Sequence, residues 1–436
     1  MITDLTISLR DNMTAQNLKQ QIIDKVESNR RQLIELSQKI HSHPEVGFKE
    51  SKAASWLSNY LSENGFTIEK GCYGLTTAFY ANYGSGKPAI GIISEYDALP
   101  GIGHACGHNI IAASAAGAAA AARLAVDQFG GSILVIGTPA EEAGGGKIIM
   151  AERGAFTDVD IAMMIHPGVH DTVIIHTLAS QVLEVEFTGK AAHAAARPEE
   201  GINALEALLQ SFTAINSLRQ HIRDQSRIHG IITDGGQAAN IVPEHSAATF
   251  IVRAESDRYL NELKHKVLRC FTGAAMASGA HLECRWHEQC YATMQNNLIL
   301  ARLFQKNMES LGRKMKFSTN KNMVFSTDMG NISQMIPSIH PMLAIAHEDI
   351  SLHSSEFVSA AASEEGIRAI IEGSTAMALT VVDLLSDPSN TNKVKEQFHK
   401  TKRGLKIDRK QISCNYHWWG ASRSYGWNVY FARPNK

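Results

Sequence analysis

The strongest constraint on the fold is a short pattern that occurs three times in the first half of the chain. An apolar run of strand length is followed almost at once by acidic side chains or a histidine. Near-continuous apolar strands separated by helical segments are typical of a parallel sheet buried between helices. We therefore predict an α/β fold with a largely parallel mixed sheet and helices on both faces. The runs are residues 89–93, 133–136 and 161–165, which precede Glu95 and Asp97, Glu141 and Glu142, and His166 respectively.

The pattern changes near residue 180. Leu183, Val185 and Phe187 alternate with Glu184 and Glu186, as in a half-exposed strand. Strand and helix signals then follow in the order βαββαβ, which suggests a small antiparallel sheet with two helices on one face. We predict a discontinuous main domain over residues 1–179 and 292–385, an inserted α+β lid over 180–291, and a C-terminal extension over 386–436.

Two further segments carry expectations that the structure can test. Residues 17–41 place apolar side chains on one helical face and predict a single amphipathic helix. The extension carries six Lys or Arg between residues 400 and 410, together with Trp418, Trp419 and Trp427. We expect it to be loosely ordered, with a docking or nucleic-acid-binding segment as the alternative.

The composition excludes several classes of protein. The chain has 436 residues, enough for two domains, with 44% hydrophobic and 19% charged residues. A net charge of -1 gives no global attraction to nucleic acid or to anionic membranes, and we expect neither as a partner. The longest apolar stretch, residues 110–126, contains Ser114, Gly117 and Arg123 and predicts an internal helix instead of a membrane span.

The chain ends and the cysteines bear on where the protein works. The N-terminus lacks a basic segment followed by an apolar core, so we expect no signal peptide. The six cysteines are scattered and form no CxxC pair. This spacing argues against a disulfide framework and predicts a reducing, cytoplasmic compartment.

The string HACGHN, residues 104–109, raises the question of a metal site. Cys106 and His108 are too close to share a face of a regular helix, but Gly107 permits a loop in which both turn to one centre. The adjacent Glu141 and Glu142 point in different directions, so one can bind metal while the other transfers a proton. A lone histidine is usually structural, and an acidic pair is usually a solvated loop. The joint placement of these residues with His166 and His353 favours a metal centre with zinc-like ligands.

The motifs that carry these residues resemble a known family. They resemble the two-metal aminoacylase and carboxypeptidase family, peptidase family M20, and within it the amidohydrolase subgroup. The likeness is greatest to dipeptidase-like and aminobenzoyl-glutamate-hydrolase-like members, and it covers about residues 20–385. The clearest motifs are EYDALPGIGHACGHN (95–109), GTPAEEAGGGK (137–147), GKAAHAAARP (189–198) and LHSSEF (352–357).

The resemblance implies a role for each matching position. It makes the segment 180–291 a dimerisation domain in a homodimer or higher homo-oligomer, and the main domain catalytic. It assigns two divalent ions to each subunit, zinc first, with manganese, cobalt or nickel as alternatives. Glu141 becomes the general base, His193 reaches the neighbouring subunit's active site, and Asp97 orients a ligand. Asn240 and Arg253 hold the substrate, and the metal ligands are Cys106, His108, Glu142, His166 and His353.

The reaction that this implies is hydrolysis of the amide bond of a dipeptide or an N-acyl amino acid with a free carboxylate. An aminobenzoyl-glutamate type of substrate is the alternative within the same class. Two other interpretations stay open from the residues: a thiol enzyme that uses Cys106 with His104 or His108 as base, and a non-catalytic scaffold. Two positions depart from the family: Asn109, where the subgroup has Asp, and Glu95, where the wider family has a histidine ligand. We expect Asn109 to alter the tuning of His108.

Overall fold

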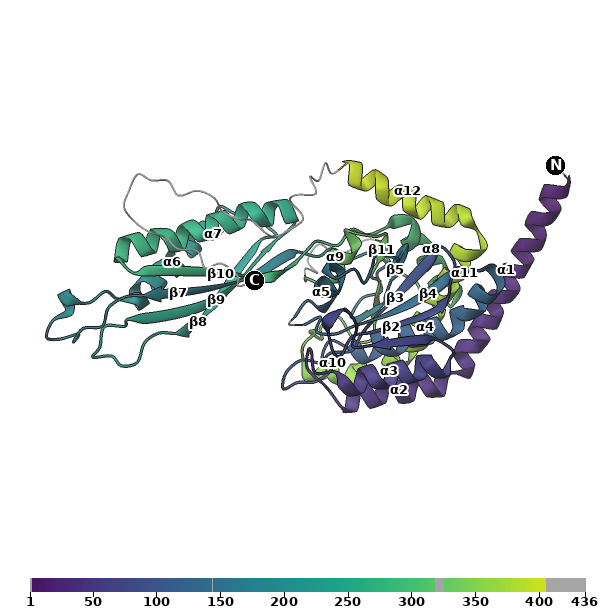
Figure 1. Cartoon of the computed structure of the whole chain (residues 1–436), viewed down its shortest axis with the longest axis horizontal. Coiled ribbons are helices and arrows are strands. Elements are labelled where there is room, and N and C mark those ends of the chain that lie inside the picture. Colours follow the sequence, from purple (N-terminus) through teal and green to yellow (C-terminus); the bar gives the residue numbers. More distant parts are fainter. Residues whose placement is uncertain (1, 143, 318–324, 405–436) are drawn as a thin grey trace. The chain divides into compact units, whose positions relative to one another are not determined.

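The computed structural model describes residues 2–142, 144–317 and 325–404. The chain divides into two compact units (Figure 1). The described part of the first unit consists of residues 2–176 and 294–404, and that of the second of residues 177–293. The segment expected to form the lid, residues 180–291, falls within the second unit.

The first unit is built on a six-stranded mixed sheet in the order β1-β2-β4-β3-β5-β11. The strands β4, β3, β5 and β11 run parallel to one another, whereas β1 and β2 pair antiparallel at one edge. The prediction of a largely parallel sheet is therefore confirmed. A parallel pair, β6 (His166–Gly168) with β12 (Met342–Ala344), lies beyond it. The strands of the main sheet are β1 (Thr67–Lys70), β2 (Phe79–Gly84), β3 (Ala89–Glu95), β4 (Ser132–Thr138), β5 (Ile161–Met163) and β11 (Ser338–Ile339).

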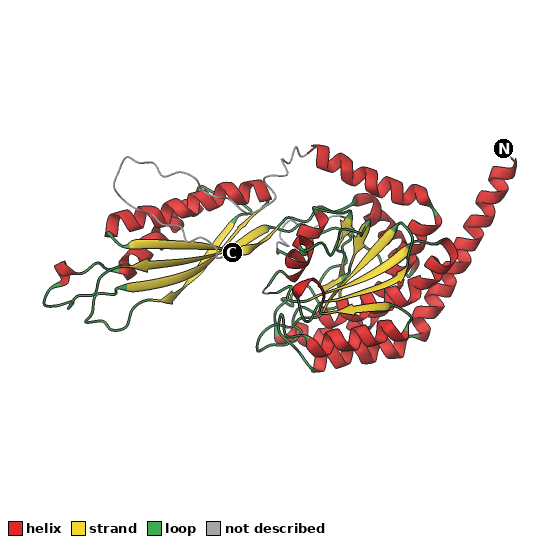
Figure 2. Cartoon of the chain, in the orientation of Figure 1, coloured by secondary structure: helices red, strands yellow, loops and turns green. Residues whose placement is uncertain are grey.

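Helices cover both faces of this sheet, as predicted (Figure 2). Alternate residues of β4 point to opposite sides: Ile133 and Val135 join the core of the larger helical layer, and Leu134 and Ile136 join the core of the smaller layer. The smaller layer contains α5 (Gly146–Glu152) and α9 (Met329–Ser333). The helices of the larger layer are α1 (Ile2–Ser28), α2 (Arg30–Ser42), α3 (Ser51–Glu63), α4 (His108–Phe129), α8 (Leu298–Ser310), α10 (Ser355–Ala361) and α11 (Glu364–Ser386).

The alanine-rich helix α4 lies in the centre of the larger layer. Its small side chains allow close packing, since a Cβ at Gly117 would lie 2.6 Å from Ser374 Oγ and 2.7 Å from Leu33 Cδ1. By length and composition α4 and α11 could cross a membrane, but 89% and 78% of their most apolar windows are buried within the protein. Burial to this extent is what core helices show.

Two sequence-based expectations about helices are wrong. The single helix expected over residues 17–41 is two helices, because the chain breaks at Asn29, whose side-chain amide donates a hydrogen bond to the Tyr60 hydroxyl. Residues 388–404 are not loosely ordered but form α12 (Pro388–Gly404). Val394 and Phe398 are four residues apart and bury themselves on one side of this helix. Residues 405–436, with the three tryptophans of the extension, lie outside the described residues.

The second unit has the predicted βαββαβ order. Its sheet has the order β10-β7-β9-β8, and every pair is antiparallel. Phe250 and Val252 are buried in the core under the two helices, while Arg253 belongs to the opposite face. The elements are β7 (Ala179–Thr188), α6 (Ala204–Arg219), β8 (Arg227–Asp234), β9 (His245–Ala254), α7 (Asp257–Ser278) and β10 (His281–Tyr291).

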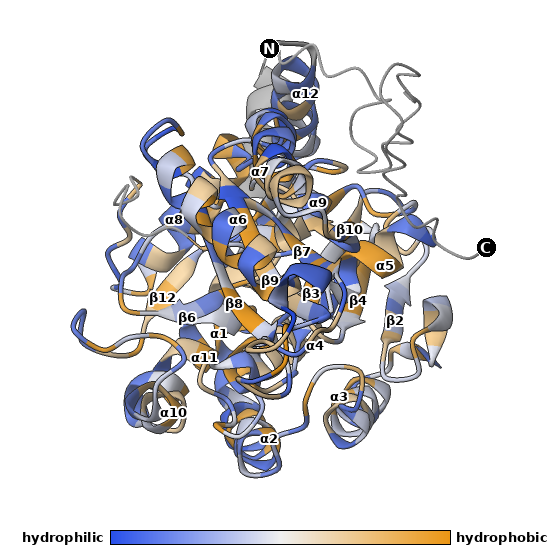
Figure 3. Ribbon diagram, turned by 90° about the vertical axis from the view of Figure 1, so that its left-hand side faces the viewer, coloured by the Kyte–Doolittle hydropathy of each residue, from blue (hydrophilic) through white to orange (hydrophobic). Residues whose placement is uncertain are grey.

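The edge strand β8 leaves apolar side chains uncovered. Ile231 is 66% exposed and Ile232 is 41% exposed, and β8 carries a clear apolar stretch in Figure 3. One side of β8 has no partner strand within the described residues. Such an edge is able to pair with another chain.

Candidate metal centre

The polar side chains singled out in the sequence lie at one edge of the main sheet. Glu95 is the last residue of β3, and Glu141 and Glu142 follow β4. His166 follows β5 and begins β6, and His108 begins α4. Because the carboxyl ends of parallel strands meet at the same edge, the topology brings these residues together.

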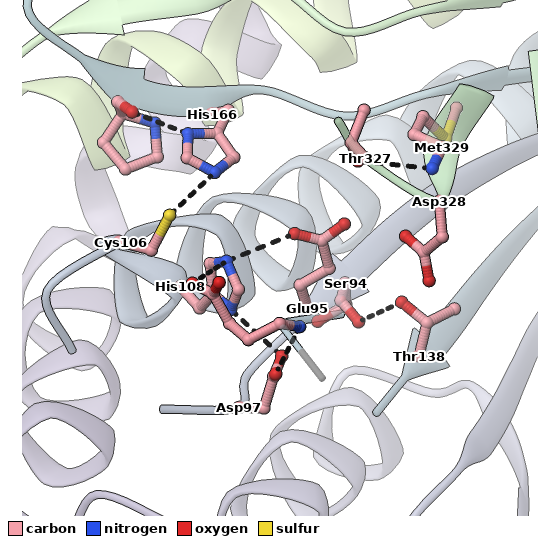
Figure 4. Close-up of polar contacts among 12 residues, drawn as sticks. Ser94, Glu95, Asp97, Cys106, His108, Thr138, His166, Thr327, Asp328 and Met329 are labelled. Atoms are coloured by element: carbon pink, nitrogen blue, oxygen red, sulfur yellow. Dashed lines mark hydrogen bonds and ion pairs between the residues drawn. The ribbon is translucent and has the colours of Figure 1, made fainter. Parts of the chain in front are cut away.

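His108 is held between carboxylates (Figure 4). Its Nδ1 donates a hydrogen bond to Asp97 Oδ1 at 3.0 Å. This bond leaves Nε2 as the free nitrogen, which lies 3.7 Å from Glu95 Oε2 and 3.8 Å from Glu142 Oε1. The other oxygen of Asp97 accepts a hydrogen bond from the Glu142 backbone N–H at 3.0 Å. One carboxylate therefore orients two candidate ligands.

Cys106 and His166 face each other, with Sγ 3.6 Å from Nε2 (Figure 4). His166 Nδ1 donates to the Pro167 carbonyl oxygen at 2.6 Å, so Nε2 keeps a lone pair that a metal ion can accept. Gly107 allows the close approach of the two segments. It has a φ of 73°, and a Cβ there would lie 2.5 Å from Pro167 Cγ.

His353 completes the cluster from the far end of the chain. Its Nε2 lies 3.6 Å from Glu142 Oε2, and its backbone N–H donates to the Ala105 carbonyl oxygen. Donor atoms within 4.8 Å of one another form three groups that could hold a metal ion. They are Cys106, His108 and His166; Cys106, Glu142 and His353; and His108, Glu141 and Glu142.

The donor set fits divalent cations. His108 Nε2 and Glu142 Oε1 are buried and have no hydrogen-bond partner among the described residues. Such atoms are costly to bury unless an ion or another polar group binds them. Sulfur, nitrogen and oxygen donors of this kind are those that zinc-like ions prefer.

The loop that carries the two glutamates is fixed at its start. Ala140 adopts a φ of 55°, and its N–H donates to the buried carboxylate of Glu50 at 2.8 Å. Glu141 is itself only 9% exposed. Burial, followed by the charges of Glu95 and Glu142, raises the pKa of Glu141 well above its usual range. A carboxylate with a raised pKa is suited to take and return protons near neutral pH.

A fully buried lysine lies behind this loop. Lys147 Nζ is 2.5 Å from Glu95 Oε1 and 2.7 Å from Asp328 Oδ1. The second oxygen of Asp328 accepts a hydrogen bond from the Lys147 backbone N–H at 3.0 Å. Burial alone would lower the pKa of Lys147, but the charges of Asp328 and Glu95 outweigh it and raise the pKa. The ion pairs therefore connect β3, α5 and the start of α9.

Sequence reasoning missed two buried side chains of this centre, Lys147 and His340. His340 follows β11, and its ring centroid lies 5.3 Å from that of His166. Burial, then the electrostatic effects of His166, Lys147 and His108, holds the pKa of His340 well below its usual range. A signal did exist, because Ile-His-Pro occurs twice, at residues 165–167 just beyond β5 and at 339–341 where β11 ends.

The geometry disfavours Cys106 as a nucleophile. Burial, then the charge of Glu142, raises the pKa of the Cys106 thiol well above its usual range. Reactive thiols have a lowered pKa and partial exposure, whereas Cys106 is 8% exposed. Its Sγ lies 3.6 Å from His166 Nε2, whereas neither His108 Nε2 nor either ring nitrogen of His104 has a hydrogen-bond partner among the described residues, Cys106 included.

Asn109 does not contact the His108 ring in any hydrogen bond of the described residues. Its side-chain amide donates to Ser37 Oγ at 2.9 Å and to the Ala361 carbonyl oxygen at 3.0 Å. The amide thus connects α4 with α2 and α10. The expectation that Asn109 tunes His108 is replaced by a packing role, and Asp97 holds the ring instead.

Three other candidates lie in the second unit. His193 is exposed, and its Nδ1 accepts hydrogen bonds from the backbone N–H groups of Ala195 and Ala196 at 3.2 Å. Its Nε2 therefore carries the proton and is a donor. The Asn240 carbonyl oxygen accepts from the Ala194 N–H at 3.0 Å, which places His193 and Asn240 on neighbouring loops. Arg253 Nε donates to His229 Nε2 at 3.4 Å on the open face of the sheet.

A family model described as peptidase family M20/M25/M40 matches residues 91–372. The chain belongs to this family. The human Xaa-Arg dipeptidase is 34% identical over 400 residues, which cover 86% of this chain and 90% of the relative. One component of the p-aminobenzoyl-glutamate hydrolase of Escherichia coli (strain K12) is 33% identical over 308 residues, covering 65% of this chain and 63% of the relative. The chain is therefore an enzyme of the hydrolase class.

Solved structures share the fold. A dinuclear metal-binding peptidase of family M20 from Bacillus subtilis superposes with a TM-score of 0.64 at 21% identity, covering 82% of this chain and 99% of its own. The aminobenzoyl-glutamate utilization protein of Klebsiella pneumoniae gives a TM-score of 0.63 at 20% identity, covering 80% and 98%. These matches support the α/β architecture described above.

The buried lysine generates a prediction about stability. Lys147→Met leaves the buried carboxylates of Glu95 and Asp328 without their positively charged partner. We expect this change to lower the free energy of unfolding by about 3–5 kcal/mol. In an Asp328→Asn background the same change leaves only the Glu95 carboxylate unpaired, so the free energy of unfolding should fall by clearly less. Chemical unfolding of metal-loaded protein for all four members of this double-mutant cycle measures the coupling. An equal cost in both backgrounds would show that the charges are not coupled.

Proposed function

We propose that this chain is a metal-dependent hydrolase that cleaves the amide bond of a dipeptide or an N-acyl amino acid with a free carboxylate. The observation that carries the proposal is the convergence of donor atoms from Cys106, His108, Glu142, His166 and His353, with Glu141 beside them. The identity to a dipeptidase over most of both chains supports a dipeptide first. Aminobenzoyl-glutamate and related N-acyl amino acids are the second candidates.

Charge supports two divalent ions in each protomer. The carboxylates of Glu95, Asp97, Glu141, Glu142 and Asp328 are each at most 10% exposed. Lys147, which pairs with two of them, cannot balance them all, so a cation-free centre would carry a large excess of buried negative charge. We assign zinc to the site because its donors are mixed, with manganese, cobalt and nickel as the alternatives.

Each residue around the reacting amide has a distinct task in the proposed mechanism. The ions, when bound, supply activation of the attacking water and polarisation of the scissile carbonyl. Glu141 accepts the proton of the attacking water and delivers it to the leaving nitrogen. Asp97 fixes the orientation of the His108 ring and the position of the Glu142 backbone, so that these ligands do not reorganise during the reaction. His193 donates from Nε2 to the developing oxyanion.

We also propose that the protein is a homodimer in a reducing, cytoplasmic compartment, with His193 acting in the partner's active site. The exposed isoleucines and unpaired edge of β8 support a self-association surface on the second unit. Among the described residues five cysteines form no disulfide, which suits a reducing compartment.

The adjacent glutamates give a matched pair of variants. Glu141→Gln should keep about two ions per chain and lose turnover by about 10²–10⁴-fold, because glutamine cannot accept the proton. Glu142→Gln should instead lose metal, because it removes a ligand oxygen. Elemental analysis and kcat on a panel of dipeptides and N-acyl amino acids, with Xaa-Arg and aminobenzoyl-glutamate included, test both. Metal-free protein with full activity, or Glu141→Gln with more than about a tenth of the wild-type rate, would refute the assignment.

A mixing experiment tests the action of His193 across the interface. His193→Ala and Glu141→Gln homodimers should each be inactive, but a mixed dimer contains one complete site if His193 acts in trans. Random reassociation should then restore about a quarter of wild-type activity, since half the dimers are mixed and one site in each is complete. Mixed dimers without recovered activity would place His193 in its own protomer's site or outside the mechanism.

Arg253 generates a prediction about the substrate. An arginine fork binds a carboxylate with two parallel hydrogen bonds, which lysine reproduces poorly, and Asn240 adds a further bond. The enzyme should prefer an N-acyl amino acid over its C-terminal amide by about ten- to a hundredfold in kcat/KM. Arg253→Lys should erode this preference without changing metal content. The control is Arg227→Lys, since Arg227 is the cross-strand neighbour of Arg253 on β8. Equal rates on acid and amide would exclude carboxylate recognition by Arg253.

A further inference from the structure

The same tripeptide, Ile-His-Pro, occurs at or just beyond the ends of the parallel strands β5 and β11, but only one of the two histidines is a candidate ligand. In the register of β5 with β11, Met163 pairs with Ile339, so His166 and His340 follow at the same edge of the sheet. The His166 N–H donates to the Pro341 carbonyl oxygen at 2.8 Å, which fixes the two Ile-His-Pro segments side by side. His340 is therefore held at the carboxyl edge where ligands bind in sheets of this kind.

The two histidines differ in their hydrogen bonds. His166 donates from Nδ1 and faces Cys106 with Nε2. His340 is 1% exposed, and neither of its ring nitrogens has a hydrogen-bond partner among the described residues. Leaving a donor and an acceptor unsatisfied in the interior is costly, and such groups usually have a ligand or a water as partner.

His340 lies beside the metal centre without belonging to its ligand set. Its ring contacts that of His166, yet His340 is absent from every group of described residues whose donor atoms lie within 4.8 Å of one another. The His340 ring therefore has an unpartnered N–H donor next to a candidate metal ligand.

We propose that His340 is a substrate-contacting residue that donates a hydrogen bond from its ring N–H to the scissile carbonyl oxygen as negative charge develops there. The inference rests on the proposed amide hydrolysis and adds a donor from the first unit to the His193 donor of the second. A preorganised N–H stabilises a developing oxyanion, and removal of one such donor typically costs about 10²–10³-fold in kcat.

Three substitutions at one position test the proposal. His340→Leu removes both ring nitrogens and should lower kcat by about 10²–10³-fold with little change in KM. His340→Asn and His340→Gln keep an N–H near the position of Nδ1 or Nε2, so one of them should recover at least about tenfold over leucine. The recovered variant identifies the donating nitrogen. Equal, full activity of His340→Leu would make His340 a packing residue and overturn the proposal.

Measurements other than turnover separate the alternatives. The leucine variant should keep about two ions per chain and an unchanged visible spectrum after Co²⁺ substitution. Its affinity for a phosphinic dipeptide analogue of the tetrahedral state should fall in parallel with kcat. Lost metal or a shifted Co²⁺ spectrum would make His340 a ligand and overturn the proposal. If the wild-type protein neither hydrolyses any substrate of the panel nor binds the analogue, the proposed function is overturned as well. If the wild-type protein and the leucine variant are equally active, only the role of His340 is overturned.

Discussion

The carboxylate of Asp97 is the contact on which the candidate centre depends. One oxygen holds the His108 ring and the other holds the Glu142 backbone, so a single side chain fixes candidate ligands from two different segments. The segments are the start of α4 and the loop after β4, and Asp97 itself follows β3. Three elements that are separate in sequence are thereby held together at one candidate metal centre.

The residues around Asp97 are strongly charged. Aligning ligand carboxylates at the end of a sheet concentrates negative charge where water is largely excluded. Lys147 neutralises part of this charge through Glu95 and Asp328, and cations are needed for the remainder. Binding of ions to such a centre contributes to the stability of the folded state as well as to catalysis.

Much of the fold follows from local sequence patterns. The apolar runs specify the parallel strands, and the polar residues that follow them must meet at one edge, which is why the positions of His108, Glu142 and His166 could be anticipated. The strand before His340 is only two residues long and follows Pro337, so its pattern is too weak to recognise. Lys147 follows three glycines and has the local features of a solvated loop residue.

What the sequence could not indicate depends on distant partners. Lys147 is buried against Asp328, which lies far along the chain and accepts a hydrogen bond from its Nζ. No local sequence pattern contains that contact. The helix α12 has few apolar residues, so its local sequence pattern is weak. It is held in place by the burial of Val394 and Phe398, which the local pattern does not reveal. Asn109 likewise owes its role to the positions of α2 and α10 and not to its place in a metal-binding motif.

The position of His353 has a consequence for how the protein is made. Cys106, His108, Glu142 and His166 emerge from the ribosome before any of the second unit, whereas His353 emerges after all of its described residues. During synthesis the centre therefore lacks a ligand until a long loop has been closed, which is the slow kind of contact in folding. The inserted unit can fold in that interval, since its strands and helices are continuous in sequence. A nascent chain would gain its full affinity for metal only near the end of translation.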